Sequence, residues 1–103
     1  MKEFTYDDTY LLIKNTLLSN FRVTEKKITP SAKFKDDLGL DSLDMIDFID
    51  YLEVMYGNEL VIDADEDNKK EFYTHIQGTV HDMTLFLQRV INEHQRKLCH
   101  EHK

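Results

Sequence analysis

The chain has 103 residues and a formal net charge of −7, and 41% of its residues are hydrophobic, enough for one small domain with a modest core. Three glycines and one proline are too few for an all-β chain with many tight turns, so the composition favours a helical bundle. No apolar run is long enough to span a membrane, the N-terminus is not of the signal-peptide type, and a single cysteine excludes an internal disulfide, so we expect a cytoplasmic protein without membrane insertion.

The charge is unevenly distributed along the chain. Residues 1–35 carry seven basic and four acidic side chains, whereas residues 36–67 carry twelve acidic side chains and no lysine or arginine. Such an acidic span repels nucleic acid and attracts basic protein surfaces. A charge run is often only a solvated face, but the complete absence of basic residues here favours a docking surface.

The first predicted element is a helix over residues 6–21. Thr5 and Asp8 have the spacing of a capping box at its start. Apolar residues then recur every three or four positions and form one stripe that faces a core. This stripe comprises Tyr6, Tyr10, Ile13, Leu17 and Phe21, flanked or broadened by Leu11, Leu12 and Leu18.

Residues 22–40 form a long connection instead of a regular element, because Pro30 interrupts it and its apolar residues are irregularly spaced. Long loops in compact domains are usually functional or attached to the core. We expect attachment through three apolar side chains of this connection, Ile28, Phe34 and Leu38.

The second predicted helix spans residues 43–56 and follows a short loop with one glycine. Asp41 is suited to cap this helix, with Asp44 three residues later. Ser42 is therefore expected in the first turn, exposed and beside the positive end of the helix dipole, where a phosphate ester would lie near free backbone N–H groups. The expected core residues are Phe48, Ile49, Leu52 and Tyr56, and the expected C-cap is Gly57-Asn58.

The run Asp-Asp-Leu-Gly-Leu-Asp-Ser-Leu-Asp over residues 36–44, at the start of an amphipathic helix, resembles the attachment motif of the acyl carrier proteins. The similarity extends upstream through residues 28–34 and returns at residues 79–83, so it covers most of residues 6–92. The resemblance implies an all-α fold, a small antiparallel helical bundle of three main helices with a shorter or irregular third helix.

By the same resemblance, the chain is a non-catalytic carrier that holds acyl intermediates as thioesters on 4'-phosphopantetheine attached covalently to Ser42, for fatty-acid or related biosynthesis. Asp41 and Leu43 flank the attachment site. A separate phosphopantetheinyl transferase is expected to install the arm from coenzyme A, and acyl-transfer, condensing and related enzymes with basic docking surfaces are the other expected partners of a monomeric protein. The residues expected to contact these partners are Asp44, Ile46, Asp47 and Glu53.

Two alternative functions remain open. A specialised carrier for polyketide, peptide or amino-acyl cargo has a similar motif, although Asp41 disfavours a peptidyl carrier. An unmodified acidic helical adaptor belongs to a different class. A serine hydrolase is disfavoured, because neither His75 nor His81 lies in a triad pattern with Ser42 and no Gly-x-Ser-x-Gly elbow is present.

The segment over residues 63–78 is longer than the short third helix and turn of a typical carrier require. We predict a helix over residues 66–77, because this stretch contains no glycine or proline, begins with acidic residues and precedes Gly78. Phe72 and Ile76 are expected to attach it to the core; the alternative is a disordered acidic insertion. The alternating aspartates in this segment lack the glycine and glutamate of a calcium loop, so we expect no metal site.

The last predicted helix begins after Gly78 at a capping box formed by Thr79 and Asp82. Its expected buried stripe comprises Val80, Met83, Phe86 or Leu87, Val90 and Ile91. From Gln95 the sequence is polar, so we divide the chain into a carrier-like helical domain over residues 1–94 and a polar C-terminal tail over residues 95–103 that is expected to fray.

Overall fold

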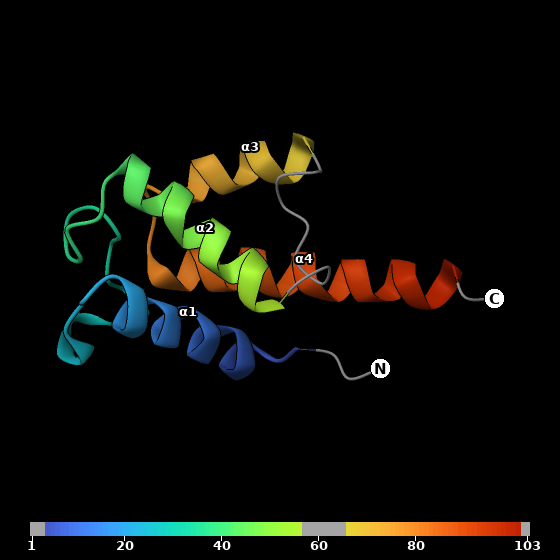
Figure 1. Cartoon of the computed structure of the whole chain (residues 1–103), viewed down its shortest axis with the longest axis horizontal. Helices are drawn as coiled ribbons and strands as arrows, with labels where there is room; N and C mark the ends of the chain where they lie inside the picture. Colours follow the sequence, from blue (N-terminus) through green and yellow to red (C-terminus); the bar gives the residue numbers. More distant parts are fainter. Residues whose placement is uncertain (1–3, 57–65, 102–103) are drawn as a thin grey trace.

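The computed structural model describes residues 4–56 and 66–101, and all named elements of this part of the chain are helices (Figure 1). Its elements are α1 (Tyr6–Asn20), a 3₁₀ turn (Glu25–Lys27), α2 (Ser42–Tyr56), α3 (Glu66–His75) and α4 (Val80–Glu101). No described helix is long and apolar enough to cross a membrane. The predicted all-α bundle is confirmed.

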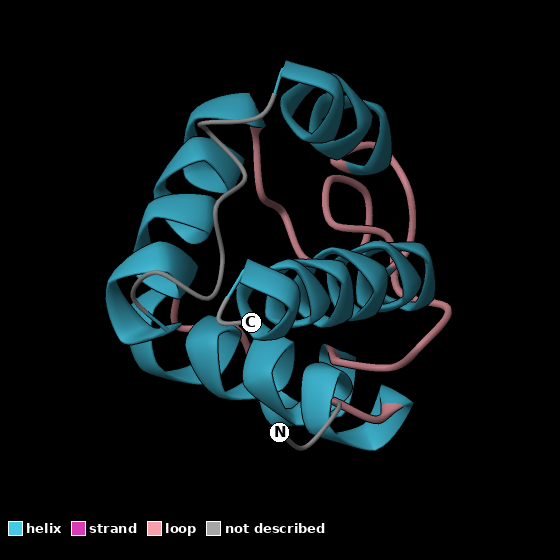
Figure 2. Ribbon diagram, turned by 90° about the vertical axis from the view of Figure 1, so that its right-hand side faces the viewer, coloured by secondary structure: helices cyan, strands magenta, loops and turns pink. Residues whose placement is uncertain are grey.

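Successive helices alternate in direction, as Figure 1 shows. Helix α4 packs against both α1 and α3, and α1 also packs against α2. The four helices therefore enclose one common interior, which is visible when the bundle is viewed from its end (Figure 2). The start of α2, the end of α3 and the start of α4 lie at the same end of the molecule (Figure 1).

Helices α1 and α4 begin at the capping boxes that the sequence predicts. The Asp8 backbone N–H donates to the Thr5 hydroxyl, and the Thr5 backbone N–H donates to the Asp8 carboxylate, both over 3.1 Å. Thr79 and Asp82 form the same reciprocal pair at α4. Each pair satisfies backbone donors that have no partner within the helix, so these starts are fixed by residues three positions apart.

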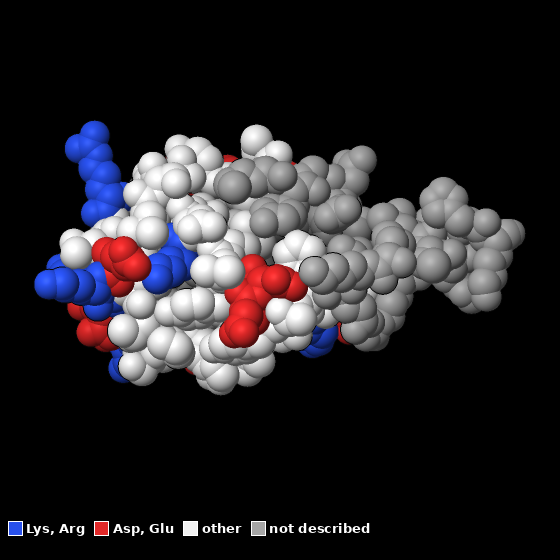
Figure 3. Space-filling model, turned by 90° about the horizontal axis from the view of Figure 1, so that it is seen from below, with Lys and Arg blue, Asp and Glu red and all other residues white. Residues whose placement is uncertain are grey.

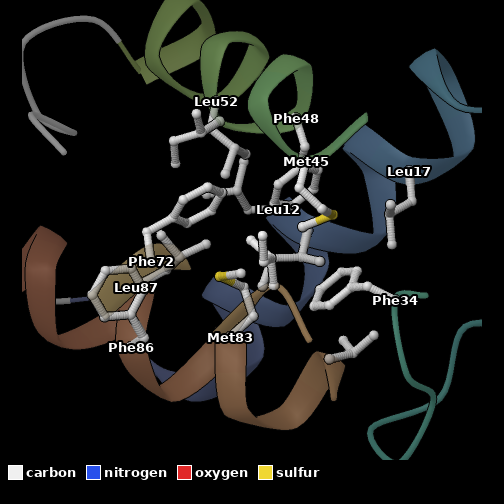
Figure 4. Close-up of a cluster of buried hydrophobic side chains, with 14 of the residues drawn as sticks. Leu12, Leu17, Phe34, Met45, Phe48, Leu52, Phe72, Met83, Phe86 and Leu87 are labelled. Atoms are coloured by element: carbon white, nitrogen blue, oxygen red, sulfur yellow. The ribbon is translucent and has the colours of Figure 1, made fainter. Parts of the chain in front are cut away.

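The core is a single cluster of apolar side chains from every helix and from the connection between α1 and α2 (Figure 4). The predicted members Phe48, Ile49 and Leu52 of α2 are buried, and so is the entire predicted stripe of α4, including both Phe86 and Leu87. Met45 was not among the predicted core residues, yet only 1% of this residue is exposed. Met45 is buried because it lies one turn before Ile49 on the inward face of α2.

The connection over residues 22–40 is attached to the core as predicted. Ile28 and Phe34 are buried, and Leu38 is partly buried against the core. Leu40, which the sequence analysis did not single out, is buried as well. This connection includes one 3₁₀ turn and therefore is not entirely irregular.

The predicted long third helix is confirmed as α3, which ends at His75, two residues earlier than predicted. Its predicted anchors Phe72 and Ile76 are both buried, although Ile76 lies just beyond the helix. The backbone of α4 remains helical from Gln95 to Glu101, where the sequence predicted fraying, because this stretch has no glycine or proline and is rich in good helix formers. The predicted C-cap Gly57-Asn58 and the side chain of Tyr56 lie outside the described residues.

Candidate functional site

Ser42 is the first residue of α2 and is exposed. The Asp44 backbone N–H donates to Asp41 Oδ1 over 2.8 Å, and the Asp41 backbone N–H donates to Asp44 Oδ2 over 3.1 Å. This reciprocal pair is a capping box in which aspartate replaces the usual serine or threonine. The two carboxylates thus fix the helix start on either side of Ser42, as predicted, and leave its hydroxyl at the surface.

A tight loop before α2 presents Ser42. The Leu40 backbone N–H donates to the Phe34 carbonyl over 2.8 Å, which closes the loop and buries Leu40. Gly39 has φ of 72°, a left-handed conformation that a residue with a Cβ rarely adopts. The Lys33 backbone N–H donates to Asp37 Oδ2 over 2.7 Å and closes the opposite side of the loop. The position of Ser42 is therefore fixed by backbone bonds as well as by its own helix.

The same loop is bonded to the turn between α3 and α4. The Phe34 backbone N–H donates to the Gly78 carbonyl over 3.3 Å, and the Val80 backbone N–H donates to the Ala32 carbonyl over 2.9 Å. Lys33 and Thr79 form an isolated antiparallel β-bridge at this point. Because these bonds join segments more than forty residues apart, they place the end of α3 beside the start of α2.

A cavity of about 110 Å³ lies where these segments meet. Its apolar wall comes from buried residues on both sides, with Met45 on α2 and Ile76 after α3. The full lining consists of Lys35, Leu40, Asp41, Ser42, Met45, Ile76 and Gln77. Ser42 therefore opens onto a small hollow with an apolar floor and a polar rim.

Apolar and acidic side chains alternate along the outer face of α2. Leu43 is 72% exposed and Ile46, an expected partner contact, is 38% exposed, so two apolar side chains lie at the surface next to Ser42. Asp47 is exposed, whereas Asp44 is half-buried and is engaged in the capping box. Glu53, the other predicted contact residue, is half-buried.

The outer face of α2 extends further than the sequence analysis indicated. Val54 is 82% exposed and lies three turns from Leu43 on the same side of the helix. Asp47 and Asp50 lie between them and are exposed. Residues 43, 47, 50 and 54 are separated by three or four positions, so the sequence alone indicates that they share one side of the helix. The ends of this stripe are apolar and its middle is acidic.

The two histidines that the sequence offers as candidate bases have other partners. His75 Nε2 lies 3.3 Å from Glu71 Oε2, and His81 Nδ1 lies 2.7 Å from the Tyr6 hydroxyl. Neither imidazole is bonded to Ser42, so the geometry does not form a nucleophile–base pair. Among the residues that the structure describes, no group of three or more His, Cys, Asp or Glu side chains is arranged to bind a metal ion.

Charged and aromatic side chains join α3 to α4. The Arg89 guanidinium forms an ion pair with Glu71, and this hydrogen bond lowers the pKa of the Glu71 carboxyl and raises the pKa of Arg89. The Arg89 side chain also lies over the Phe86 ring, 5.7 Å from its centroid, and the His75 ring lies 5.2 Å from the same ring. This cluster is not apparent from the sequence, because its members lie up to eighteen positions apart on two helices.

The model of one protein family, described as the phosphopantetheine attachment site (PP-binding), matches residues 12–64. This stretch covers about half of the chain and includes α2 with the exposed Ser42 at its start. No solved structure matches the chain.

Proposed function

Because the chain belongs to the phosphopantetheine attachment family, we propose that Ser42 is the residue that carries the arm and that the protein presents acyl intermediates to separate enzymes. Members of this family bear covalently attached 4'-phosphopantetheine, and this chain is a carrier of that kind. The observation that supports Ser42 is its position: it is exposed, it begins α2, and it lies between the two carboxylates of a capping box.

The residues around Ser42 fit this group. When bound, the arm supplies a terminal thiol that holds acyl groups as thioesters. Installation from coenzyme A forms a bond between Ser42 Oγ and phosphorus, breaks the pyrophosphate P–O bond, and releases adenosine 3',5'-bisphosphate and the hydroxyl proton. Asp41 and Asp44 fix the helix start, so the serine hydroxyl is presented to a transferase without rearrangement of the chain.

The intact mass of the protein after incubation with coenzyme A and a phosphopantetheinyl transferase tests this assignment. We expect the wild-type chain to gain the mass of one arm and Ser42→Ala to gain nothing, with unchanged helical content because an exposed first-turn hydroxyl contributes little to stability. Ser31→Ala is the matched control, since Ser31 is also exposed and precedes the site by only eleven positions. Loading of Ser42→Ala would refute the assignment.

Helix α2 is the proposed docking surface for partner enzymes. Leu43 and Ile46 offer apolar contacts beside the arm, and Asp47 offers a negative charge to basic surfaces. No lysine or arginine occurs between residues 36 and 67, so the field around this helix attracts cationic partners at a distance. Fatty-acid or related biosynthesis is the proposed context, and polyketide, peptide or amino-acyl cargo is the alternative that loading with each class of acyl group distinguishes.

A further inference from the structure

Lys35 lies at the rim of the cavity onto which Ser42 opens. It is the only cationic residue of the lining, and it is exposed. Within residues 4–56 and 66–101 its ammonium group has no ion-pair partner. It is also the last basic residue before the acidic span of residues 36–67. A cation without an ion-pair partner in the described part of the chain thus lines the same cavity as the hydroxyl that is proposed to become a phosphodiester.

The backbone fixes the position of Lys35 relative to Ser42. The carbonyl of Lys35 accepts from the Gly39 backbone N–H over 3.2 Å, within the loop that leads directly into α2. The neighbouring Phe34 is bonded to Gly78, which brings Gln77 to the other side of the same cavity. Gln77 adds an amide that can donate hydrogen bonds. Two donors from separate segments therefore line the cavity onto which Ser42 opens.

The size of the cavity indicates which part of the arm it can receive. Pockets that enclose a drug-sized ligand measure about 300–1,000 Å³. The cavity at Ser42 measures about 110 Å³, so it accommodates only the groups nearest to the attachment point. Those groups include the phosphodiester, which carries one negative charge. A cation at this rim meets the charge that the modification introduces.

The other charged residue of the cavity lining, Asp41, is already engaged. Its carboxylate accepts from the Asp44 backbone N–H over 2.8 Å. Asp41 is negative and adjacent to Ser42 in the chain, so a phosphodiester on Ser42 without a cation nearby would be repelled. Lys35 is the group that offsets this repulsion.

We propose that Lys35, with Gln77 as a second donor, pairs with the phosphodiester of the arm and holds its first segment against the rim of the cavity. The inference rests on the proposed attachment at Ser42. Lys35 is a positioning residue, because it orients the base of the arm and takes no part in thioester chemistry. The pair is exposed to solvent, so salt weakens it and it forms and breaks rapidly.

Phosphorus NMR of the fully loaded protein tests the proposal independently of any activity. Wild-type, Lys35→Gln and Lys33→Gln proteins are loaded with coenzyme A and a transferase until the intact mass shows complete conversion. The phosphodiester resonance is then followed from about 0.01 M to about 1 M NaCl, which shortens the Debye length from roughly 30 Å to roughly 3 Å. Lys33→Gln is the matched control, because it removes the same charge from the same loop at a residue that does not line the cavity.

We expect the wild-type and Lys33→Gln resonances to shift with salt, and the Lys35→Gln resonance to lose most of that shift and to lie near the high-salt position throughout. Loading should also shift the side-chain amide of Gln77 in the wild-type protein and much less in Lys35→Gln. Identical salt dependence in all three fully loaded proteins would overturn the role of Lys35 while leaving the attachment at Ser42 intact. Failure of the wild-type protein to gain mass would refute the proposed function, and this inference with it.

Discussion

Replacement of Phe72 by alanine tests how α3 is attached to the bundle. Only 2% of Phe72 is exposed, and α3 has ten residues, too few to remain helical without tertiary contacts. A buried aromatic side chain removes about 150–200 Å² from water, equivalent to about 4–5 kcal/mol at 25 cal/mol/Å², and this figure is an upper bound because the unfolded chain already buries some area. We therefore expect Phe72→Ala to lower the free energy of unfolding by about 3–4 kcal/mol.

The adjacent Tyr73 provides a matched control. It is 42% exposed, and its ring meets that of Phe72 edge to face with centroids 5.9 Å apart. Tyr73→Ala should cost no more than about 1 kcal/mol, the contribution of one aromatic contact and partial burial. Urea denaturation gives both values, and amide exchange should show loss of protection in α3 for Phe72→Ala before the other helices are affected. Equal losses for the two variants, or a loss below about 1 kcal/mol for Phe72→Ala, would refute the assigned anchoring role.

The charge on α2, the Glu71–Arg89 ion pair and the burial of Phe72 each give a further prediction. Asp47→Lys should slow arm transfer mainly by lowering the association rate with the transferase, and the wild-type rate should fall as salt rises. A rate that does not change with salt would contradict electrostatic steering by α2. Asp47 is a better probe than Asp44, because charge reversal at Asp44 also removes the cap of the helix. Arg89 lowers the pKa of Glu71 in the folded state, so the pair stabilises the fold above the ordinary glutamate pKa and this contribution disappears as pH falls through the lowered value. Glu71→Gln should therefore reduce stability at pH 7 but not at pH 2–3 in paired urea titrations, by less than about 1 kcal/mol because the carboxylate is 38% exposed, and equal losses at both pH values would contradict this. Phe72→Ala should also change which acyl chains are protected from thioester hydrolysis, and an unchanged chain-length profile would limit α3 to a structural role.

The parts of the structure that the sequence predicted correctly depend on residues close together in the chain. The capping boxes at Thr5, Asp41 and Thr79 need only a partner three positions later, so the starts of α1, α2 and α4 were accessible from the sequence. The exposed position of Ser42 follows from the same local geometry. Phe72 and Ile76 were identified because a spacing of four residues places them on one face.

The parts that the sequence did not predict depend on contacts between distant segments. The Lys33–Thr79 bridge, the cavity at Ser42 and the ion pair of Glu71 with Arg89 each need the relative placement of two elements. The burial of Leu40 depends on the bond that closes its loop onto Phe34. The helical backbone of α4 through Glu101 has another reason: the stretch from Gln95 is polar, but helix propensity depends on the absence of glycine and proline as much as on apolar content.

The bonds between the loop and the α3–α4 turn connect the packing of α3 to the attachment site. Phe72 and Ile76 lie one helical turn apart on the same face, and Ile76 with Gln77 forms one wall of the cavity at Ser42. The opposite wall belongs to the start of α2 and the loop before it. That loop is bonded through Phe34 to the turn that follows α3. A change that loosens Phe72 therefore displaces the wall that carries Gln77 while leaving the cap of α2 intact. Consequently, Phe72→Ala should alter the surroundings of the arm without preventing its attachment, whereas loss of the Asp41–Asp44 cap should impair attachment itself.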